Sequence, residues 1–576
     1  MTRRNPKPKP NLIKWRFATV ASVITMVFTV LLGRAAYIQV IDPDRLQREG
    51  DMRSLRTTST QVQRGIISDR HGQPLAISVP VQAVWADPKV IHQKGSLKDL
   101  RAWQALSDVL SIEVEKLRGK VQNPKKRFVY LQRQVSPAMA QYVDQLGLPG
   151  VYLKPESRRF YPTGEISAHV IGFTNIDDKG QEGIERTYDD WLTGTPGERK
   201  VRKDRHGRVI EDIAIVKQAQ QAKDIELSID QRLQSIAYQA LKKIVQLNNA
   251  TSGSAVVIDI TTGEVLAMVN SPSFNPNNRG QFQSFRVRNR AITDTFEPGS
   301  TVKPLVVASA LINEVVAPDE VIDTSPGWMR VGGRRVADHR NYGEMDLAKI
   351  LQKSSNVGVS KLALALSPEK LKDTFYDVGL GNDTGIGLIG ETSGMLPERR
   401  RWSDFELATM SFGYGITANT LQLAQAYAIL ANGGISYPLS IIKLDKQPQG
   451  EQVIPKEVAF RVLNMLEGVT QPGGTGLQAR VDGYRVAGKT GTSRKAVAGG
   501  YGDDYVAVFA GVAPVSNPKL AIAVTVNEPK GDRYYGGDVA APVFAEVMDG
   551  SLQLLNVIPD DKDVRLTRVS KPEAAQ

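Results

Sequence analysis

Ser300 and Lys303 lie three residues apart in the stretch FEPGSTVKP, a spacing that suits a serine nucleophile and a lysine base. Residues i and i+3 of a helix share one face, so a helix beginning after Pro298 would place the two side chains together. A serine hydroxyl attacks a carbonyl only when a neighbouring base removes its proton. The same spacing recurs at three other pairs, Ser367/Lys370, Ser440/Lys443 and Ser516/Lys519. Only the surroundings of Ser300 can therefore distinguish it.

Two further motifs follow Ser300 along the chain. The first is Ser354-Ser355-Asn356, and the second is Lys489-Thr490-Gly491-Thr492. The set S-x-x-K, S-x-N and K-T-G, in this order, resembles that of the penicillin-recognising serine enzymes. Lys-Thr-Gly occurs once in the chain and directly follows a strand-like run. The three motifs together predict a serine acyl-transfer site.

The role of base requires an unusual lysine at position 303. An ordinary lysine is charged at pH 7 and cannot accept a proton. Burial and a second nearby cation both disfavour the charged form, and Lys489 can be that cation. We therefore predict that Lys303 is at least partly neutral in the folded protein.

The S-x-N motif supplies the next groups of the predicted site. The Ser354 hydroxyl can pass the serine proton to a leaving amine. Asn356 can hydrogen-bond both Lys303 and an amide of the substrate. Ser355, the middle residue of the motif, is expected to contribute to substrate binding.

The K-T-G motif predicts a substrate clamp on an edge strand. An extended peptide can pair with such an edge by strand addition. Gly491 has no side chain to block that approach, while Lys489 and the hydroxyls of Thr490 and Thr492 can bind a terminal carboxylate. The backbone N–H groups of Ser300 and Thr492 would form an oxyanion hole.

The elements around these motifs predict an α+β domain. Residues 252–270 and 503–529 both read as β-hairpins, and a closing helix is expected over 538–555. Several helical segments lie between the hairpins, including one that begins near Ser300. Hairpins at both ends of a helical middle favour an antiparallel sheet covered by helices.

At 576 residues the chain is long enough for two or more domains. Before the α+β domain, which we expect over 224–557, the sequence is irregular, rich in turns and mostly β-like. It predicts a non-catalytic domain over 41–223. A polar tail is expected over 558–576.

The N-terminus predicts a membrane anchor. Residues 1–16 carry six positive charges and no acid, and residues 17–33 carry no charge. About 17–25 apolar residues can span a bilayer as a helix, and a basic flank favours a cytoplasmic N-terminus. We expect an uncleaved anchor over 17–40 behind a cytoplasmic tail over 1–16. The alternative is a cleavable signal peptide, because Gly33-Arg34-Ala35 is similar to a cleavage site.

Composition narrows the remaining classes of function. The chain has no cysteine, which excludes disulfides and thiolate chemistry, and its five histidines are scattered. We expect no metal and no cofactor. Formal net charge is +12, but residues 1–225 hold 37 Lys+Arg against 24 Asp+Glu, and residues 226–576 hold 36 against 37. The excess is N-terminal and accompanies no nucleic-acid motif, so anionic lipid or protein partners are favoured over nucleic acid.

Taken together, the chain resembles a class B penicillin-binding protein, most closely the division-specific septal transpeptidases of the penicillin-binding protein 3 type. The resemblance covers nearly the whole chain. It rests on the three motifs, the single anchor and the stretches RGIISDRHG (64–72), RRFYP (158–162), GIE (183–185), YGITANTLQLAQAYA (414–428) and KTGTSRK (489–495).

The resemblance implies a peptidoglycan D,D-transpeptidase. Ser300 would attack the penultimate D-Ala carbonyl of a stem pentapeptide and expel the last D-Ala. An amine of a neighbouring stem would then resolve the acyl-enzyme as a 4→3 cross-link. β-Lactams would acylate the same serine.

The resemblance also implies a location and partners. The chain would be a single-pass protein of the bacterial inner membrane with its catalytic domain in the periplasm. The domain over 41–223 would be a pedestal that contacts other division proteins, notably a lipid-II-polymerising glycosyltransferase of the SEDS type. The pedestal residues that it implies, which would hold the domains together, are Arg64, Gly65, Asp69, Arg158 and Glu185.

Two departures and several alternatives remain. The middle motif reads Ser-Ser-Asn where β-lactamases have Ser-Asp-Asn, and Asn419 stands where relatives often have proline. An elongation-type transpeptidase, a D,D-carboxypeptidase and a β-lactamase would use the same residues. A penicillin sensor or a non-catalytic divisome scaffold is the alternative outside enzymes. A sensor would need a cytoplasmic output domain, and a degenerate scaffold would be expected to have lost Ser300, Lys303 or Lys489.

Overall fold

The computed structural model describes residues 14–561 except 42–47, 49–50, 53, 61, 205–208, 279, 281 and 498. Most of the predicted cytoplasmic tail and residues 562–576 of the predicted polar tail therefore lie outside the described residues. The chain forms two compact units. One comprises residues 1–62 and 194–221, and the other comprises residues 63–193 and 222–576.

The first unit contains the predicted anchor and a small sheet. Helix α1 (Lys14–Ala36) continues into a π-helical turn at Tyr37–Ile41. The helical run Lys14–Val40 has a mean hydropathy of 1.8 and no side chain in its most apolar part is buried. Its length and composition suffice to cross a membrane. The sheet has the order β1-β8-β9, with bounds Leu55–Thr60, Gly197–Lys203 and Val209–Lys217.

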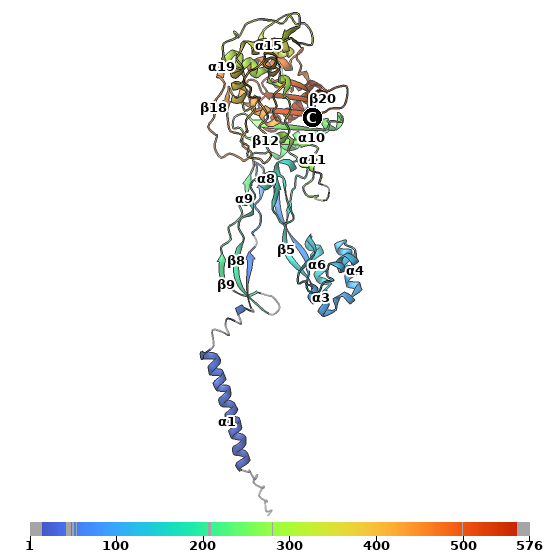
Figure 1. Ribbon diagram of the computed structural model, residues 1–576, viewed down its shortest axis with the longest axis vertical. Coiled ribbons are helices and arrows are strands. Elements are labelled where there is room, and N and C mark those ends of the chain that lie inside the picture. Colours follow the sequence, from blue (N-terminus) through green and yellow to red (C-terminus); the bar gives the residue numbers. More distant parts are fainter. Residues whose placement is uncertain are drawn as a thin grey trace, which may run out of the picture. The chain divides into compact units, whose positions relative to one another are not determined.

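The N-terminal part of the second unit is built on strand β3 (Pro74–Ala86) (Figure 1). Strands β4 (Val129–Val135) and β5 (Val151–Phe160) pair with it in antiparallel register. The short strands β2 (Ile67–Ser68) and β10 (Ile225–Glu226) complete this sheet. Four helices cover one face of β3, namely α3 (Pro88–Lys94), α4 (Leu100–Leu110), α5 (Val114–Lys120) and α6 (Pro137–Gln145). The region expected to be mostly β thus also contains a helical subdomain.

Short elements connect this part to the C-terminal part of the same unit. They are α7 (Ala168–Ile171), β6 (Phe173–Thr174), β7 (Gly180–Glu182), α8 (Gly183–Thr187) and α9 (Asp189–Thr193). Asp69 ties the two parts together, because its carboxylate accepts hydrogen bonds from the backbone N–H of His71 at 2.9 Å, of Gln73 at 2.8 Å and of Gln231 at 3.2 Å.

The C-terminal part contains an antiparallel five-stranded sheet of order β12-β11-β21-β20-β19. The strands span Val265–Ser271, Ser252–Asp259, Leu520–Asn527, Gly500–Ala513 and Ala487–Val497. Successive side chains of a strand point to opposite faces. Val257 accordingly packs in the core under α10 (Gln231–Leu247) and α20 (Gly536–Leu554), and Val256 in the core that includes α18 (Thr420–Ala431). Both predicted hairpins and the closing helix are present.

The helical middle lies between β12 and β19 in the sequence. Besides α18, its helices are α11 (Ser284–Val287), α12 (Arg290–Thr293), α13 (Lys303–Ile312), α14 (Leu347–Lys353), α15 (Asn356–Ala365), α16 (Pro368–Asp377), α17 (Asp404–Met410) and α19 (Lys456–Thr470). Its two-stranded ribbons are β13–β16 (Ile322–Asp323, Glu344–Met345), β14–β15 (Trp328–Val331, Arg334–Ala337) and β17–β18 (Ile435–Ser436, Glu451–Gln452). The predicted α+β class is confirmed.

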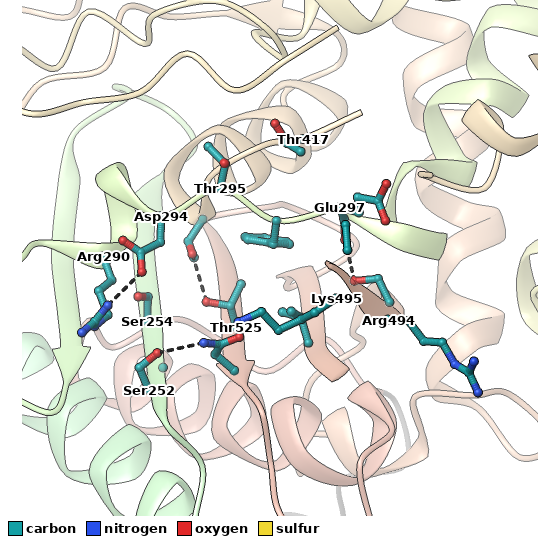
Figure 2. A pocket seen from close by; sticks show the side chains of 17 residues that line it. Ser252, Ser254, Arg290, Asp294, Thr295, Glu297, Thr417, Arg494, Lys495 and Thr525 are labelled. Carbon is teal, nitrogen blue, oxygen red and sulfur yellow. Dashed lines mark hydrogen bonds and ion pairs between the residues drawn. The ribbon is translucent and has the colours of Figure 1, made fainter. Parts of the chain in front are cut away.

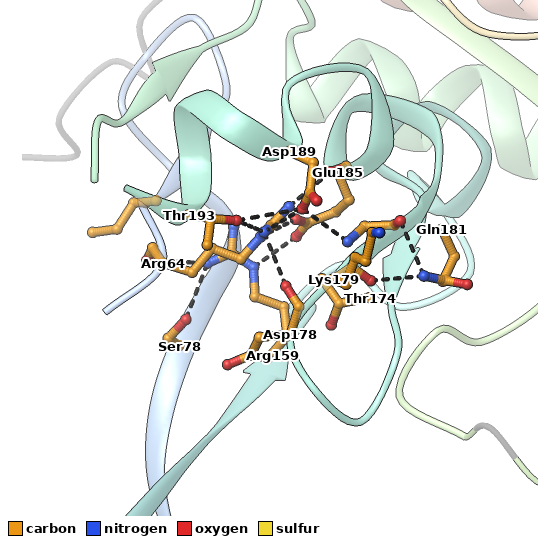
Figure 3. A network of polar contacts seen from close by, with 12 residues as sticks. Arg64, Ser78, Arg159, Thr174, Asp178, Lys179, Gln181, Glu185, Asp189 and Thr193 are labelled. Carbon is orange, nitrogen blue, oxygen red and sulfur yellow. Dashed lines mark hydrogen bonds and ion pairs between the residues drawn. The ribbon is translucent and has the colours of Figure 1, made fainter. Parts of the chain in front are cut away.

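A buried ion network joins Arg64, Arg159 of β5 and Glu185 of α8 (Figure 3). The two carboxylate oxygens of Glu185 accept from Nε of Arg64 and Nε of Arg159, each at 2.6 Å. All three side chains are at most 4 % exposed. The RRFYP stretch therefore contributes Arg159 to this network, whereas Arg158 instead donates to the Asn277 carbonyl at 3.3 Å. Gly65 is needed nearby because a Cβ there would lie 2.1 Å from the Lys223 carbonyl oxygen.

Replacing Glu185 with glutamine is expected to destabilise the protein strongly. Removing one partner of a buried ion pair leaves uncompensated charge and costs about 3–5 kcal/mol. The Tm of the full chain in detergent micelles, measured by calorimetry, should fall by several degrees. Glu546→Gln is the control, because its pair with Lys243 is about half exposed and contributes little. Equal Tm values for the two variants would contradict the importance of the network.

Candidate active site

Ser300 lies in a 3₁₀ turn, Gly299–Val302, that runs directly into α13. Gly299 has φ +58°, a conformation that glycine adopts without strain. Its N–H donates to the Gly413 carbonyl at 3.3 Å, and a Cβ on Gly413 would lie 2.2 Å from the Gly299 carbonyl oxygen. Close backbone packing therefore fixes the turn. The expectation of a helix beginning near Ser300 is confirmed.

Lys303 lies behind Ser300 and is fully buried. Its Nζ lies 2.6 Å from the Ser354 carbonyl oxygen, 2.8 Å from Oδ1 of Asn356 and 3.2 Å from Oγ of Ser354. The first two atoms can only accept, whereas the hydroxyl can also donate. A neutral amine, with two N–H groups and one lone pair, satisfies all three partners. Among the described residues, the Ser300 hydroxyl itself makes no hydrogen bond and remains free.

The electrostatics of the site favour the neutral amine. Burial lowers the pKa of Lys303 well below 10.5, and the nearby Lys489 ammonium lowers it further. The Asp338 carboxylate acts in the opposite direction and raises it. Burial also lowers the pKa of Lys489 to about 7. The direction of the Lys303 shift agrees with the role that its spacing predicts.

Ser354 connects the two lysines. It ends α14 with φ 57°, and its Oγ lies 3.0 Å from Nζ of Lys489 as well as 3.2 Å from Nζ of Lys303. A hydroxyl between two fully buried amines, both with lowered pKa values, is a suitable proton relay. The structure thus brings together the three motifs around one oxygen atom.

Ser355 has a different position from the one expected. Its side chain is fully buried, caps α15 by accepting from the Gly358 N–H at 2.9 Å, and donates to Asp338 at 2.6 Å. The hydroxyl therefore uses both its donor and its acceptor function in contacts within the protein. The expectation of a substrate contact is therefore corrected: Ser355 is an N-cap residue that holds the motif in place.

Asp338, which no sequence motif marks, organises the S-x-N motif. It follows β15 and accepts from the backbone N–H of Asn356 at 2.5 Å and of Val357 at 2.9 Å. The side-chain N–H of Asn356 donates to the Ala337 carbonyl at 3.0 Å. Because a carboxylate at a helix N-terminus is favoured by the free N–H groups there, Asp338 fixes the start of α15.

Strand β19 carries the third motif and is the edge of the sheet, as predicted. Lys489 is fully buried, and the hydroxyls of Thr490 and Thr475 lie 2.7 Å apart. The reason for Gly491 is corrected: a Cβ there would lie 2.7 Å from the Pro298 carbonyl oxygen. The glycine therefore makes room for the turn that carries Ser300, not for substrate.

A cavity of about 510 Å³ opens over these residues. Of the predicted site residues it is lined by Ser300, Ser354, Asn356, Thr490 and Thr492. Lys303, Ser355, Lys489 and Gly491 lie behind this surface. The lining residues that the sequence did not reveal are His339, Phe412, Tyr414, Thr475, Arg494, Tyr505, Tyr534, Tyr535, Gly537 and Asp538. They come from strands β19 and β20, the start of α20 and several loops, and they share no spacing pattern.

A smaller pocket of about 240 Å³ lies beside this cavity (Figure 2). Arg494 lines both. At the boundary the Ser493 hydroxyl donates to the Glu297 carbonyl at 2.7 Å, which ties β19 to the segment leading into Ser300. Among the described residues, no group of three or more His, Asp or Glu side chains gathers that could hold a metal ion.

The fold and the site define a serine acyltransferase of the Ser/Lys type: a half-buried serine that lines the cavity, a buried lysine with lowered pKa, and a hydroxyl relay beside an edge strand. The protein-family model described as "Penicillin binding protein transpeptidase domain" matches residues 253–549. A second family model, described as "Penicillin-binding Protein dimerisation domain", matches residues 59–227.

Known proteins resemble the chain over nearly its whole length. The peptidoglycan D,D-transpeptidase FtsI of Escherichia coli K12 is 51 % identical over 564 residues, which cover 97 % of this chain and 95 % of the relative. The probable peptidoglycan D,D-transpeptidase PenA of Neisseria gonorrhoeae is 42 % identical, covering 96 % and 94 %. A solved peptidoglycan synthetase from Bifidobacterium adolescentis has TM-score 0.69 at 26 % identity, covering 89 % and 98 %. The chain belongs to the penicillin-binding transpeptidases of the FtsI type, which confirms the predicted family and enzyme class.

Replacing Asp338 with asparagine is expected to slow acylation by benzylpenicillin about tenfold or more. The variant weakens the two contacts with the backbone N–H groups of Asn356 and Val357, and each hydrogen bond to a charged group contributes about 1.5–3 kcal/mol. The Asp338 charge also raises the pKa of Lys303. Its removal lowers that pKa, so the acid limb of the rate profile should move to lower pH. The measurement is the second-order acylation rate constant as a function of pH.

The exposed Asp319, changed to asparagine, is the matched control for this variant. It removes the same charge from the same part of the sequence without touching the motif, so its profile should superimpose on that of the unmodified protein. If the acylation rate constant of Asp338→Asn has the same maximum and the same acid limb as that of the unmodified protein, Asp338 does not organise the site.

Proposed function

We propose that this chain cross-links peptidoglycan at the division septum, with Ser300 as the nucleophile of a D,D-transpeptidase. The observation that carries the proposal is the buried Lys303, whose amine contacts the two residues of the S-x-N motif that face the cavity. A buried lysine without a carboxylate partner within ion-pair distance is costly, and such perturbed groups concentrate at functional sites.

Acylation begins when neutral Lys303 takes the proton of the Ser300 hydroxyl. The serine oxygen bonds to the penultimate D-Ala carbonyl carbon, and the backbone N–H groups of Ser300 and Thr492 stabilise the oxyanion. The C–N bond to the terminal D-Ala then breaks. Lys303 returns the proton through the Ser354 hydroxyl to the departing amine, so the base is neutral again.

The other cavity residues bind the donor peptide. Its backbone extends the sheet at β19, and its terminal carboxylate lies near the hydroxyls of Thr490 and Thr492 with Lys489 behind them. Asn356 retains one side-chain N–H for the substrate, because its other donor and its Oδ1 are occupied by Ala337 and Lys303. An amine from a second stem peptide resolves the ester in the reverse sequence of proton transfers.

The location and partners extend the proposal. Helix α1 anchors the chain in the inner membrane with the N-terminus in the cytoplasm and the catalytic part in the periplasm, as the basic flank of the apolar run favours. The region over 41–223 is the pedestal that meets a SEDS-type glycosyltransferase and other division proteins. No role in catalysis is assigned to it.

Intact-mass measurement after benzylpenicillin tests the nucleophile. The full chain in detergent micelles is expected to gain one stable adduct, because a transpeptidase acyl-enzyme reacts with an acceptor amine and is hydrolysed only slowly by water. Ser300→Ala should gain none. Ser516→Ala is the matched control, since Ser516 and Lys519 repeat the spacing on an exposed segment, and it should be acylated normally.

Three outcomes would change the assignment. Rapid loss of the adduct with accumulation of opened penicillin would favour a hydrolase. An adduct that persists in Ser300→Ala would place the nucleophile elsewhere. No adduct on the folded, unmodified chain would favour a non-catalytic scaffold.

A further inference from the structure

His339 lines the catalytic cavity together with Ser300, Ser354 and Asn356. It is exposed, and among the described residues its imidazole has no hydrogen-bond or ion-pair partner. The two residues before it are fixed, because Asp338 and the Ala337 carbonyl both bond to Asn356. A free imidazole is thus held at the rim of the site by the same contacts that position the S-x-N motif.

The cavity has to accommodate two peptides, and the donor occupies one part of it. Strand addition at β19 uses the surface formed by Thr490, Thr492 and Arg494, with Tyr505 and the segment Tyr534–Asp538 beside it. An edge strand accepts only one further strand. The acceptor therefore requires the remaining surface, which is lined by His339, Ser354, Asn356, Phe412 and Tyr414.

The acceptor also has a chemical requirement. A primary alkyl amine has a pKa near 10.4 and reaches the site as an ammonium ion at neutral pH. Only the deprotonated amine has the lone pair that attacks the ester. On the remaining surface, Phe412 is apolar, and Ser354 and Asn356 already contact Lys303. Burial raises the pKa of Tyr414, so its phenol stays neutral and is a poor proton acceptor. His339 carries a ring nitrogen that can accept a proton.

We propose that His339 recognises the acceptor amine and accepts its surplus proton, which makes it a specificity residue for the amine over water. This inference rests on the proposed transpeptidase function. The acceptor ammonium donates to the imidazole and transfers one proton to it, and the imidazolium releases that proton to solvent.

The remaining steps are those of the proposed relay. The neutral amine attacks the acyl carbon, a C–N bond forms and the C–O bond to Ser300 breaks. The second proton lost by the nitrogen passes through Ser354 and Lys303 to the serine oxygen. The hydroxyl of Ser300 is regenerated and every proton is accounted for.

Asp538 is the rival group for an ammonium ion. It also lines the cavity, and its carboxylate can pair with a cation. It accepts from Nε2 of Gln478 at 3.1 Å and lies in the first turn of α20, beside the surface that the donor uses. A carboxylate in that place suits a cationic group on the donor peptide better than the attacking amine.

The test is the partition of the acyl-enzyme between amine and water. The full chain in detergent micelles receives a D-alanyl thioester as the donor and D-alanine at increasing concentration as the acceptor. Mass spectrometry quantifies the amide and acid products. His339→Ala is expected to lower the amide-to-acid ratio about tenfold at subsaturating acceptor, the effect of one hydrogen bond to a charged group. The conservative His339→Gln should recover the KM for the acceptor but not kcat, because an amide accepts a hydrogen bond and no proton.

Arg340→Ala is the matched control, an exposed neighbour in the same segment, and its ratio should be unchanged. Acylation by benzylpenicillin is measured in parallel for each protein. An unchanged ratio in His339→Ala that is still acylated would overturn the inference and leave the transpeptidase proposal standing. A ratio that falls in Asp538→Asn but not in His339→Ala would transfer the role to Asp538. Failure of the unmodified chain to be acylated would overturn both proposals.

Discussion

The catalytic part of the protein depends on one buried amine. Lys303 has no carboxylate within ion-pair distance among the described residues, and its Nζ is held by the carbonyl of Ser354, the amide oxygen of Asn356 and a hydroxyl. A charged amine in this place would carry a large desolvation penalty. The fold therefore lowers the pKa of Lys303, and the same burial that costs stability supports its proposed role as a base.

Three distant segments have to meet at this amine. The turn with Ser300 is fixed by backbone packing against Gly413, the S-x-N motif by Asp338, and the K-T-G motif by its place in the sheet. Lys489 adds a second buried amine at Ser354. The N-terminal part of the unit has a separate buried network around Glu185, which satisfies its charges by pairing and not by neutralisation.

The sequence predicted the α+β class, and it predicted that the three motifs meet in one site, because both depend on local signals: i, i+3 spacing, hairpins with turn residues and an apolar run. The supporting contacts were not predictable in the same way. Asp338 reaches Asn356 across 18 residues, and Arg159 reaches Glu185 across 26, with no periodicity to mark either pair. For Ser355 and Gly491 the structure shows a role that the sequence did not indicate. Ser355 caps a helix, and Gly491 leaves room for the backbone of the turn that carries Ser300. Both roles depend on the tertiary structure. His339 could be recognised as a candidate site residue only from the cavity that it lines in the folded structure.

The central claim is that Lys303 is a neutral base at physiological pH, and the pH dependence of acylation tests it most directly. The second-order rate constant for benzylpenicillin should reach a plateau well below pH 10.5 and fall on the acid side as Lys303 gains a proton. Lys489→Met should move that acid limb to higher pH, because the neighbouring cation lowers the pKa of Lys303. A rate that keeps rising up to about pH 10, the range of an ordinary lysine, would contradict the account.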